Sequence, residues 1–289
     1  MDNPAYVLGH SEQELQRLRR QALLIEPATR LFLGEGGIGA GMRVLDVGSG
    51  AGDVAFLAAG FVGETGEVIG TDKSPAAVAA ASQRAREQGL RHISFREGDP
   101  AQMRFDRPFD AVIGRYVLLF QADPAAMVRR LLQHLRAGGL VLFHEPDWQS
   151  ARSIPAVPTY DSCCRWIQQT FARAGTDSNM AGRLYRTLIG AGFSTPAMRM
   201  QTFIGGGAQC ADYLQAVADL VGSMLPSIVQ YGGASAAEID HATLAERMQR
   251  ETTTGECLII GRSEIGAWAR LPLEEGLPAA ECGGFASEI

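Results

Sequence analysis

The chain has 289 residues, 46% of them hydrophobic, so it is long enough to bury a large core as one elaborated domain. Acidic residues outnumber basic ones 32 to 26, giving a net charge of -6, and no dense Lys/Arg block is present, which argues against nucleic acid as a partner. The N-terminus lacks a basic region followed by an apolar run, and no uninterrupted apolar stretch of about 18 residues occurs. We therefore expect a soluble, cytoplasmic protein without membrane insertion.

The first predicted elements alternate between strand and helix. Leucines at helical spacing over residues 11–33 predict an N-terminal helix. Residues 43–47 then form a predicted strand that leads through a glycine-rich turn into a helix at 54–62. A second strand at 67–71 and a second helix at 76–88 follow, with Ser74 and Pro75 as the helix start. This alternation predicts an α/β, Rossmann-like, doubly wound and mostly parallel sheet of seven strands.

Further strands are predicted at 93–96, 109–114 and 140–143, with a helix from Asp123 to about Arg136 before the last of them. Prolines after Glu145 interrupt the alternation and indicate inserted lid helices. The expected organisation is, in chain order, an N-terminal helical lid segment (1–35), a Rossmann-like cofactor-binding core (36–148), a helical insertion (149–185), remaining sheet elements (186–208 and 255–272), a second helical insertion (209–254) and a mobile tail (273–289).

The turn after the first strand reads Gly48-Ser-Gly50-Ala-Gly52. Alternating glycines leave the backbone bare, so a nucleotide-like cofactor can lie across the turn and against the next helix; a purely structural turn is the alternative. Asp72 ends the second strand about 20 residues further on, where a carboxylate can accept both hydroxyls of a ribose. Its alternative role is a charge at the start of the next helix.

Asp46, two places before the first glycine, distinguishes between cofactors. A carboxylate there would repel a diphosphate but suits the sulfonium and α-amino groups of S-adenosylmethionine (SAM). The glycine spacing also differs from the Gly-x-Gly-x-x-Gly pattern of nicotinamide enzymes. The residues therefore favour SAM, with S-adenosylhomocysteine as the product.

Four motifs in order carry a family resemblance: residues 44–52, 68–72, 95–99 (FREGD) and 109–118 (FDAVIGRYVL). Over roughly residues 40–200 the chain resembles the class I SAM-dependent methyltransferases, particularly the type 11 group that is similar to ubiquinone and menaquinone biosynthesis methyltransferases. The resemblance implies transfer of the methyl group of SAM to an O, N or C atom of a small, largely apolar or aromatic metabolite, with a place in secondary metabolism. The alternative is a SAM-fold enzyme that uses its pocket for a cyclisation or rearrangement without methyl transfer.

The resemblance also implies roles for individual residues. Asp99 would bind the adenine amino group and Lys73 would lie beside the adenine, although Pro100 removes a backbone N–H expected to contact it. Gly48 and Gly50 would lie against the methionine part, near Gly114 and Arg115. Arg115 would either pair with the methionine carboxylate or anchor the end of the sheet.

Methyl transfer needs little beyond alignment and desolvation, so a catalytic base is optional. Where a base is needed, His144 is a candidate, oriented by Glu145 or Asp147, at the sheet edge where ligands of such folds bind. Alternatively, His144 hydrogen-bonds within the sheet edge while Glu145 and Asp147 cap the insertion that follows. His10 is a second candidate base, because the N-terminal segment could close over the cofactor.

Aromatic residues of the lid segments and the fourth strand predict an enclosed apolar pocket for the acceptor, represented by Tyr6, Tyr116, Trp148 and Trp166. The same residues could instead bury the lid's own face or a homodimer interface. The five cysteines include no Cys-x-x-Cys pair and no His at zinc-ligand spacing, so no metal site is expected.

Overall fold

The computed structural model describes residues 12–273, with side chains described from residue 24 onward. Its centre is an eight-stranded sheet in the order β3-β2-β1-β4-β5-β8-β6, with β7 paired to β8. The strands are β1 (Arg43–Val47), β2 (Glu67–Asp72), β3 (Ile93–Glu97), β4 (Phe109–Arg115), β5 (Leu135–Asp147), β6 (Arg152–Ile154), β7 (Ala197–Gly206) and β8 (Leu258–Arg270).

The strands β1 to β5 pair in parallel, and β8 joins antiparallel to β5. Parallel neighbours require crossover connections, which the helices between these strands supply. β7 pairs along one edge of β8, whereas β5 and the short β6 follow each other along the other edge. The expected Rossmann-like sheet of seven strands is confirmed in its α/β layout, and the eighth strand is the three-residue β6.

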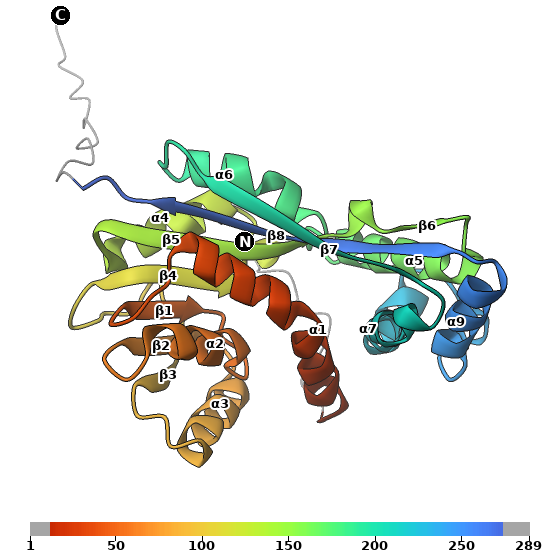
Figure 1. Cartoon of the computed structure of the whole chain (residues 1–289), viewed down its shortest axis with the longest axis horizontal. Helices are drawn as coiled ribbons and strands as arrows, with labels where there is room; N and C mark the ends of the chain where they lie inside the picture. The colour runs from red at the N-terminus through yellow and green to blue at the C-terminus, as the bar shows by residue number, and fades with distance from the viewer. Residues whose placement is uncertain (1–11, 274–289) are drawn as a thin grey trace, which may run out of the picture.

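The α-helices are α1 (Glu12–Gly36), α2 (Asp53–Val62), α3 (Pro75–Glu87), α4 (Pro124–Leu131), α5 (Pro158–Arg173), α6 (Leu184–Gly190), α7 (Ala211–Gln230), α8 (Ala236–Ile239) and α9 (Leu244–Thr254). Short 3-10 helices are η1 (Leu118–Phe120), η2 (Leu132–His134), η3 (Trp148–Ser150), η4 (Met180–Arg183) and η5 (Gly207–Cys210). Figure 1 shows β8 running from the parallel strands out to the group formed by α5, α7 and α9, with α1 lying between the two halves.

Two neighbouring predicted boundaries were wrong. The helix expected to reach Arg136 ends at Leu131, and β5 already begins at Leu135 instead of at residue 140. Leu135 pairs with Phe109 at the start of β4, and the register shifts before Ala111 pairs with Leu140. Gly138, with φ of 71°, lies in this irregular stretch, so the glycines accommodate a strand irregularity rather than end a helix.

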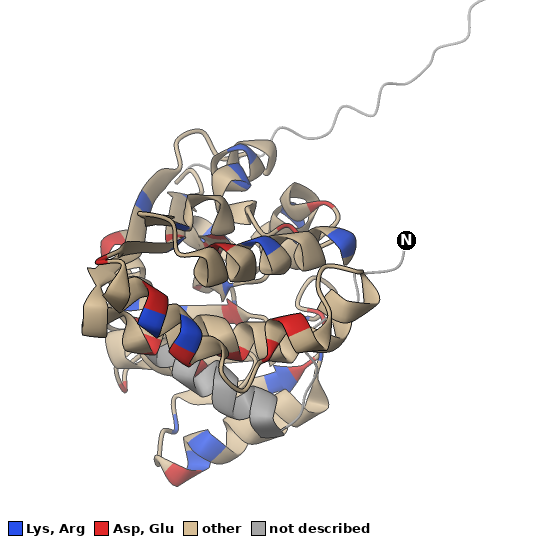
Figure 2. Ribbon diagram, turned by 90° about the vertical axis from the view of Figure 1, so that its right-hand side faces the viewer, with Lys and Arg blue, Asp and Glu red and all other residues tan. Residues whose placement is uncertain are grey.

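Among the residues whose side chains are described, the core consists of three clusters. One covers the face of the sheet toward α1 and α2, and a second covers the face toward α4 and α6. The third joins α5, α7 and α9 to the start of β8. Basic and acidic residues are interspersed along the ribbon rather than gathered on one element (Figure 2). No helix within residues 12–273 is long and apolar enough to cross a bilayer.

Candidate functional site

The glycine turn between β1 and α2 is built from left-handed backbone. Gly48, Gly50 and Gly52 have φ of 64°, 52° and 90°. A Cβ on Gly48 would lie 2.8 Å from Val117, and one on Gly52 would lie 2.8 Å from Phe95, whereas a Cβ on Gly50 would meet no atom within 4 Å. Gly50 therefore borders open space, as expected where a ligand lies against bare backbone.

Asp72 at the end of β2 supports this turn. Its Oδ2 accepts a hydrogen bond from the N–H of Gly50 at 2.9 Å, and its Oδ1 accepts one from the N–H of Ser74 at 2.8 Å. The carboxylate thus joins the glycine turn to the start of α3, in line with the alternative role considered from the sequence. Carboxylate oxygens have further lone pairs, so the predicted role in binding a ribose stays open.

Lys73 and Asp99 meet at the same edge of the sheet. The Nζ of Lys73 lies 3.2 Å from Oδ2 of Asp99, while Oδ1 of Asp99 accepts a hydrogen bond from the N–H of Ala101 at 3.0 Å. Because β2 and β3 are parallel neighbours, the residues that follow them lie side by side. The structure brings these two residues together; their contact with adenine stays a prediction.

Asp46 is the least satisfied group of the turn. The residue is 1% exposed, and neither carboxylate oxygen accepts a well-aligned hydrogen bond within the described part of the chain, although the backbone N–H of Ala55 is close enough to favour the ionised form. Burial raises the pKa of Asp46 to about 8, against the opposing charge of Arg115. A buried carboxylate without partners is costly, and a cationic ligand group beside the turn would supply the missing partner.

Arg115 at the end of β4 connects the turn to α1. Its Nη1 donates a hydrogen bond to Oγ1 of Thr29 at 3.1 Å, and the same oxygen lies 3.2 Å from Nδ1 of His144. Arg115 therefore holds α1 against the end of the sheet, which is a form of the anchoring role considered from the sequence. Its pairing with a methionine carboxylate stays a prediction.

His144 is 1% exposed, and both of its ring nitrogens are engaged. Nδ1 lies beside Thr29, and Nε2 lies 2.9 Å from Oε2 of Glu264. Burial lowers the pKa of His144, although the Glu264 carboxylate opposes this shift. The imidazole thus has no open nitrogen for a substrate among these contacts, and the expected orientation by Glu145 or Asp147 is wrong. Both residues lie an odd number of positions from His144 along β5, so their side chains point to the other face of the sheet.

Glu145 and Asp147 instead begin 3-10 helices. Oε1 of Glu145 accepts hydrogen bonds from the N–H groups of Val117 (2.9 Å) and Leu118 (2.7 Å), at the start of η1. Asp147 accepts one from the N–H of Gln149 in η3 at 2.9 Å. Burial raises the pKa of Glu145 to about 8. The capping alternative is confirmed for Asp147, while Glu145 caps the segment after β4 rather than the insertion after β5.

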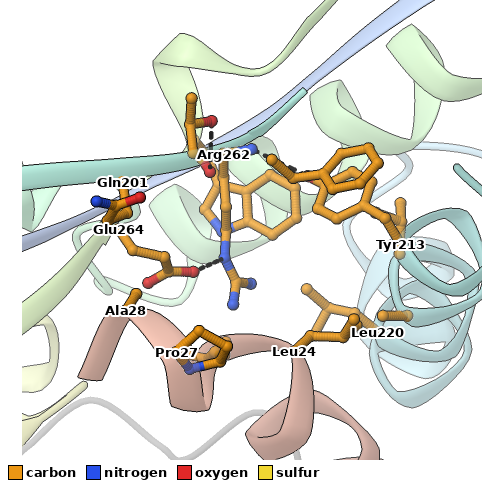
Figure 3. Close-up of a pocket in the computed structure, with 14 residues that line it drawn as sticks. Leu24, Pro27, Ala28, Gln201, Tyr213, Leu220, Arg262 and Glu264 are labelled. Atoms are coloured by element: carbon orange, nitrogen blue, oxygen red, sulfur yellow. Dashed lines mark hydrogen bonds and ion pairs between the residues drawn. The ribbon is translucent and has the colours of Figure 1, made fainter. Parts of the chain in front are cut away.

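A cavity of about 230 Å³ lies between α1, α7, η3 and the strands β7 and β8 (Figure 3). Apolar residues form most of its wall, including Leu24, Pro27 and Ala28 of α1 and Leu220 of α7. Trp148, Phe203 and Tyr213 add aromatic surface, and the rings of Phe203 and Tyr213 stack at 4.8 Å. The wall thus suits a mainly apolar ligand.

Two charged residues of β8, Arg262 and Glu264, also line the cavity. Nε of Arg262 donates to Oε1 of Glu264 at 2.8 Å, and Nη2 donates to the hydroxyl of Tyr116 at 2.8 Å. That hydroxyl donates in turn to Oε2 of Glu264 at 2.7 Å. Burial alone would raise the pKa of Glu264. The charge of Arg262 and the hydrogen bonds with His144 and Tyr116 outweigh this effect and lower the pKa to about 2.

The predicted pocket aromatics separate into three groups. Trp148 lines the cavity, and Tyr116 touches it through Arg262 and Glu264. Trp166 packs against the α5–α7–α9 cluster and does not line this cavity, so its place in an acceptor pocket stays a prediction. Trp166 is intermediate in exposure and lies beside Gly233. Tyr6 and His10 lie outside the described residues.

Sequence reasoning missed Arg262, Glu264 and Thr29. A usable signal existed for the first two, since Arg262 and Glu264 stand two apart, and so on one face of a strand, between the apolar residues 258–260 and 267–269. Thr29 carried no signal, because a threonine in an amphipathic helix is unremarkable without knowledge of what packs against it. Within residues 24–273, no group of three or more His, Cys, Asp or Glu is placed to hold a metal ion.

Comparison with known proteins identifies the family to which the chain belongs. A family model described as a methyltransferase domain matches residues 38–186, more than half of the chain. The chain is 38% identical over 119 residues to the aklanonic acid methyltransferase DauC of Streptomyces sp. (strain C5), a match covering 41% of this chain and 54% of that protein. It is 40% identical over 100 residues to a 2-phytyl-1,4-naphtoquinone methyltransferase of Synechococcus elongatus, covering 34% of this chain and 43% of that protein.

The crystal structure of the YcgJ protein from Bacillus subtilis superposes with a TM-score of 0.57 at 19% identity, covering 85% of this chain and 99% of that one, and shows a shared fold. The chain spans about half the length of the two curated relatives it matches. The alternative of a cyclisation or rearrangement gains no support from these matches. The match over residues 38–186 includes β1 to β5 and the whole glycine turn, so the chain belongs to the class I SAM-dependent methyltransferases.

Proposed function

We propose that the protein transfers the methyl group of SAM to an O, N or C atom of a small, largely apolar or aromatic metabolite bound in the cavity beside α1. Asp46 carries the cofactor part of this proposal. Its buried carboxylate lacks a partner and adjoins a glycine turn that borders open space, an arrangement that fits a ligand with a cationic end. The family assignment supplies the reaction class.

SAM supplies an electrophilic methyl group on a sulfonium, and this chain would contribute positioning rather than covalent chemistry. Asp46 would neutralise the ligand's α-amino group, and Asp72 would hold the ribose hydroxyls with the oxygen lone pairs that Gly50 and Ser74 leave free. Lys73 and Asp99 would border the adenine. Displacement at a methyl group gains most of its rate from alignment and exclusion of water.

The contacts between turn and cavity support a single site. Arg115, whose charge acts on Asp46, donates to Thr29, and Thr29 contacts His144. His144 bonds Glu264, which lines the cavity. α1 covers this cavity with Leu24, Pro27 and Ala28, so a ligand there would be shielded from water, as methyl transfer requires.

Calorimetric titration with S-adenosylhomocysteine tests the cofactor part. The wild type should bind in the micromolar range, and Asp72→Ala should weaken binding by more than tenfold. Asp123→Ala is the matched control, because Asp123 likewise accepts a backbone N–H at a helix start, from Ala126 at 2.9 Å, but begins α4. Absence of binding by the wild type, or equal losses in the two variants, would refute the assignment.

A further inference from the structure

The guanidinium group of Arg262 is held rigidly inside the cavity. It lies 5.0 Å from the ring centroid of Trp148 and 5.4 Å from that of Tyr116, and its side chain is 12% exposed. Hydrogen bonds to Glu264 and Tyr116 fix its orientation. Figure 3 shows the end of the side chain extending into the space between β8 and the α1 residues Pro27 and Leu24.

These bonds leave much of the group unused. An arginine side chain has five N–H donors, and the contacts with Glu264 and Tyr116 occupy one on Nε and one on Nη2. No described residue accepts a hydrogen bond from Nη1 of Arg262. The edge formed by Nη1 and Nη2 therefore keeps free donors in the geometry that matches the two oxygens of a carboxylate.

Neighbouring hydrogen-bond donors compensate the negative charge of Glu264. Its Oε1 accepts from Arg262, and its Oε2 accepts from Tyr116 and lies within hydrogen-bonding distance of Nε2 of His144. The other described residues that line the cavity are uncharged. What this wall still offers to a ligand is thus a set of cationic donors beside flat aromatic surfaces, those of Trp148, Phe203 and Tyr213.

We infer that the acceptor is a planar molecule that carries a carboxylate, and that Arg262 binds this carboxylate through its free edge while the ring system lies against the aromatic wall. The inference rests on the proposed function, since it takes the cavity as the acceptor site. Arg262 is here a specificity-determining residue, and Glu264 and Tyr116 position it.

The test compares two probes of one shape, 2-naphthoate and the uncharged 2-naphthamide, by calorimetry with the protein saturated with S-adenosylhomocysteine. We expect the wild type to bind the acid at least tenfold more tightly than the amide. The double variant Arg262→Gln/Glu264→Gln removes both charges together, so no single buried charge is left unpaired. It should lose the preference for the acid.

Arg262→Lys is the second variant, and it covers the case in which the double variant does not fold. Lysine keeps the positive charge but lacks the paired N–H donors of the guanidinium group, so the preference for the acid should become smaller without disappearing. If Arg262 were only structural, both probes would weaken equally. A wild type that binds the amide as tightly as the acid, or binds neither, would overturn the inference. Failure to bind S-adenosylhomocysteine in the same calorimeter would instead contradict the proposed function.

Discussion

Nε2 of His144 and Oε2 of Glu264 lie 2.9 Å apart, joining β5 to β8 across 120 residues of sequence. Because the Glu264 carboxylate is ionised, the proton of a neutral His144 belongs on Nε2, and Nδ1 is left as an acceptor beside the hydroxyl of Thr29, whose one proton also has the carbonyl oxygen of Ile25 within reach at 3.2 Å. His144 therefore ties the cavity wall to α1. This arrangement predicts a positioning role for His144 rather than that of a general base.

The buried, neutral state of His144 predicts sensitivity to acid. Its pKa is lowered in the folded protein, so the unfolded chain takes up a proton near its ordinary pKa of about 6.5 while the folded protein does not. The contribution of His144 to the free energy of unfolding should therefore be complete above that pH and be lost as the pH falls from about 7 to 5. The difference in free energy of unfolding between the wild type and His144→Gln should change by this amount over the same range, measured by urea unfolding at several pH values. A variant profile parallel to that of the wild type would contradict the assignment.

Gly50 offers a test that separates cofactor contact from backbone strain. Gly50→Ala places a Cβ in open space beside the turn at φ of 52°, so it should cost about 1 kcal/mol of stability and at least tenfold in affinity for S-adenosylhomocysteine. Gly89→Ala is the matched control, since Gly89 has φ of 67°, equally free space, and a position just after the end of α3. It should lose similar stability and keep its affinity. Equal affinities in the two variants would place the ligand away from Gly50.

Much of the fold could be predicted from local patterns. The glycine turn, Asp72 and the strand–helix alternation predicted β1 to β4 closely. Short apolar strands and capped helices can be predicted in this way because their sequence signals lie within a few residues of one another. The end of α4 could not be predicted in this way. Leu135 joins β5 because it pairs with Phe109, a contact that local propensity cannot reveal.

In the candidate site, too, the features set by local sequence could be predicted and the contacts between distant residues could not. Residues within motifs, such as Lys73 and Asp99, lie together as the sheet order requires. His144 and Glu145 were identified, but their partners were not, because Thr29 and Glu264 lie far from them in sequence. Adjacent residues of a strand face opposite sides, so neighbours in sequence were poor candidates for a catalytic pair.

Tyr116 provides a test of the network that holds Arg262. Its backbone has φ of 58°, which is strained for a residue with a side chain, and its hydroxyl both donates to Glu264 and accepts from Arg262. Tyr116→Phe keeps the ring and leaves both partners with an unmet contact, so it should lower the free energy of unfolding by about 1 to 3 kcal/mol. Tyr185→Phe, at an exposed position of α6, should change it by less than about 0.5 kcal/mol. Similar values for the two variants in urea unfolding would mean that the Tyr116 hydroxyl bonds do not stabilise the fold.

Asp46 should show opposite effects on stability and on binding. In the folded, ligand-free protein burial raises its pKa from 3.8 to about 8, so between these values the folded state retains a proton that the unfolded chain has released. The contribution of Asp46 to stability therefore falls as the pH rises through this window, and Asp46→Asn should remove that loss. At pH 8 the variant should unfold with a free energy higher by about 1 kcal/mol or more, and it should bind S-adenosylhomocysteine at least tenfold more weakly.

Asp110→Asn is the control, because the pKa of Asp110 is shifted in the opposite direction to that of Asp46. Although burial alone would raise the pKa of Asp110, hydrogen bonds from the N–H of Arg43 at 2.7 Å and from Nε of Arg136 at 2.5 Å keep it below its ordinary value. Its ionised form is therefore stabilised by folding, and the asparagine variant should be less stable at neutral pH while keeping its affinity for the ligand. An Asp46→Asn protein that is less stable than the wild type at pH 8, or that retains full affinity, would show that this carboxylate is not held ready for a cationic ligand.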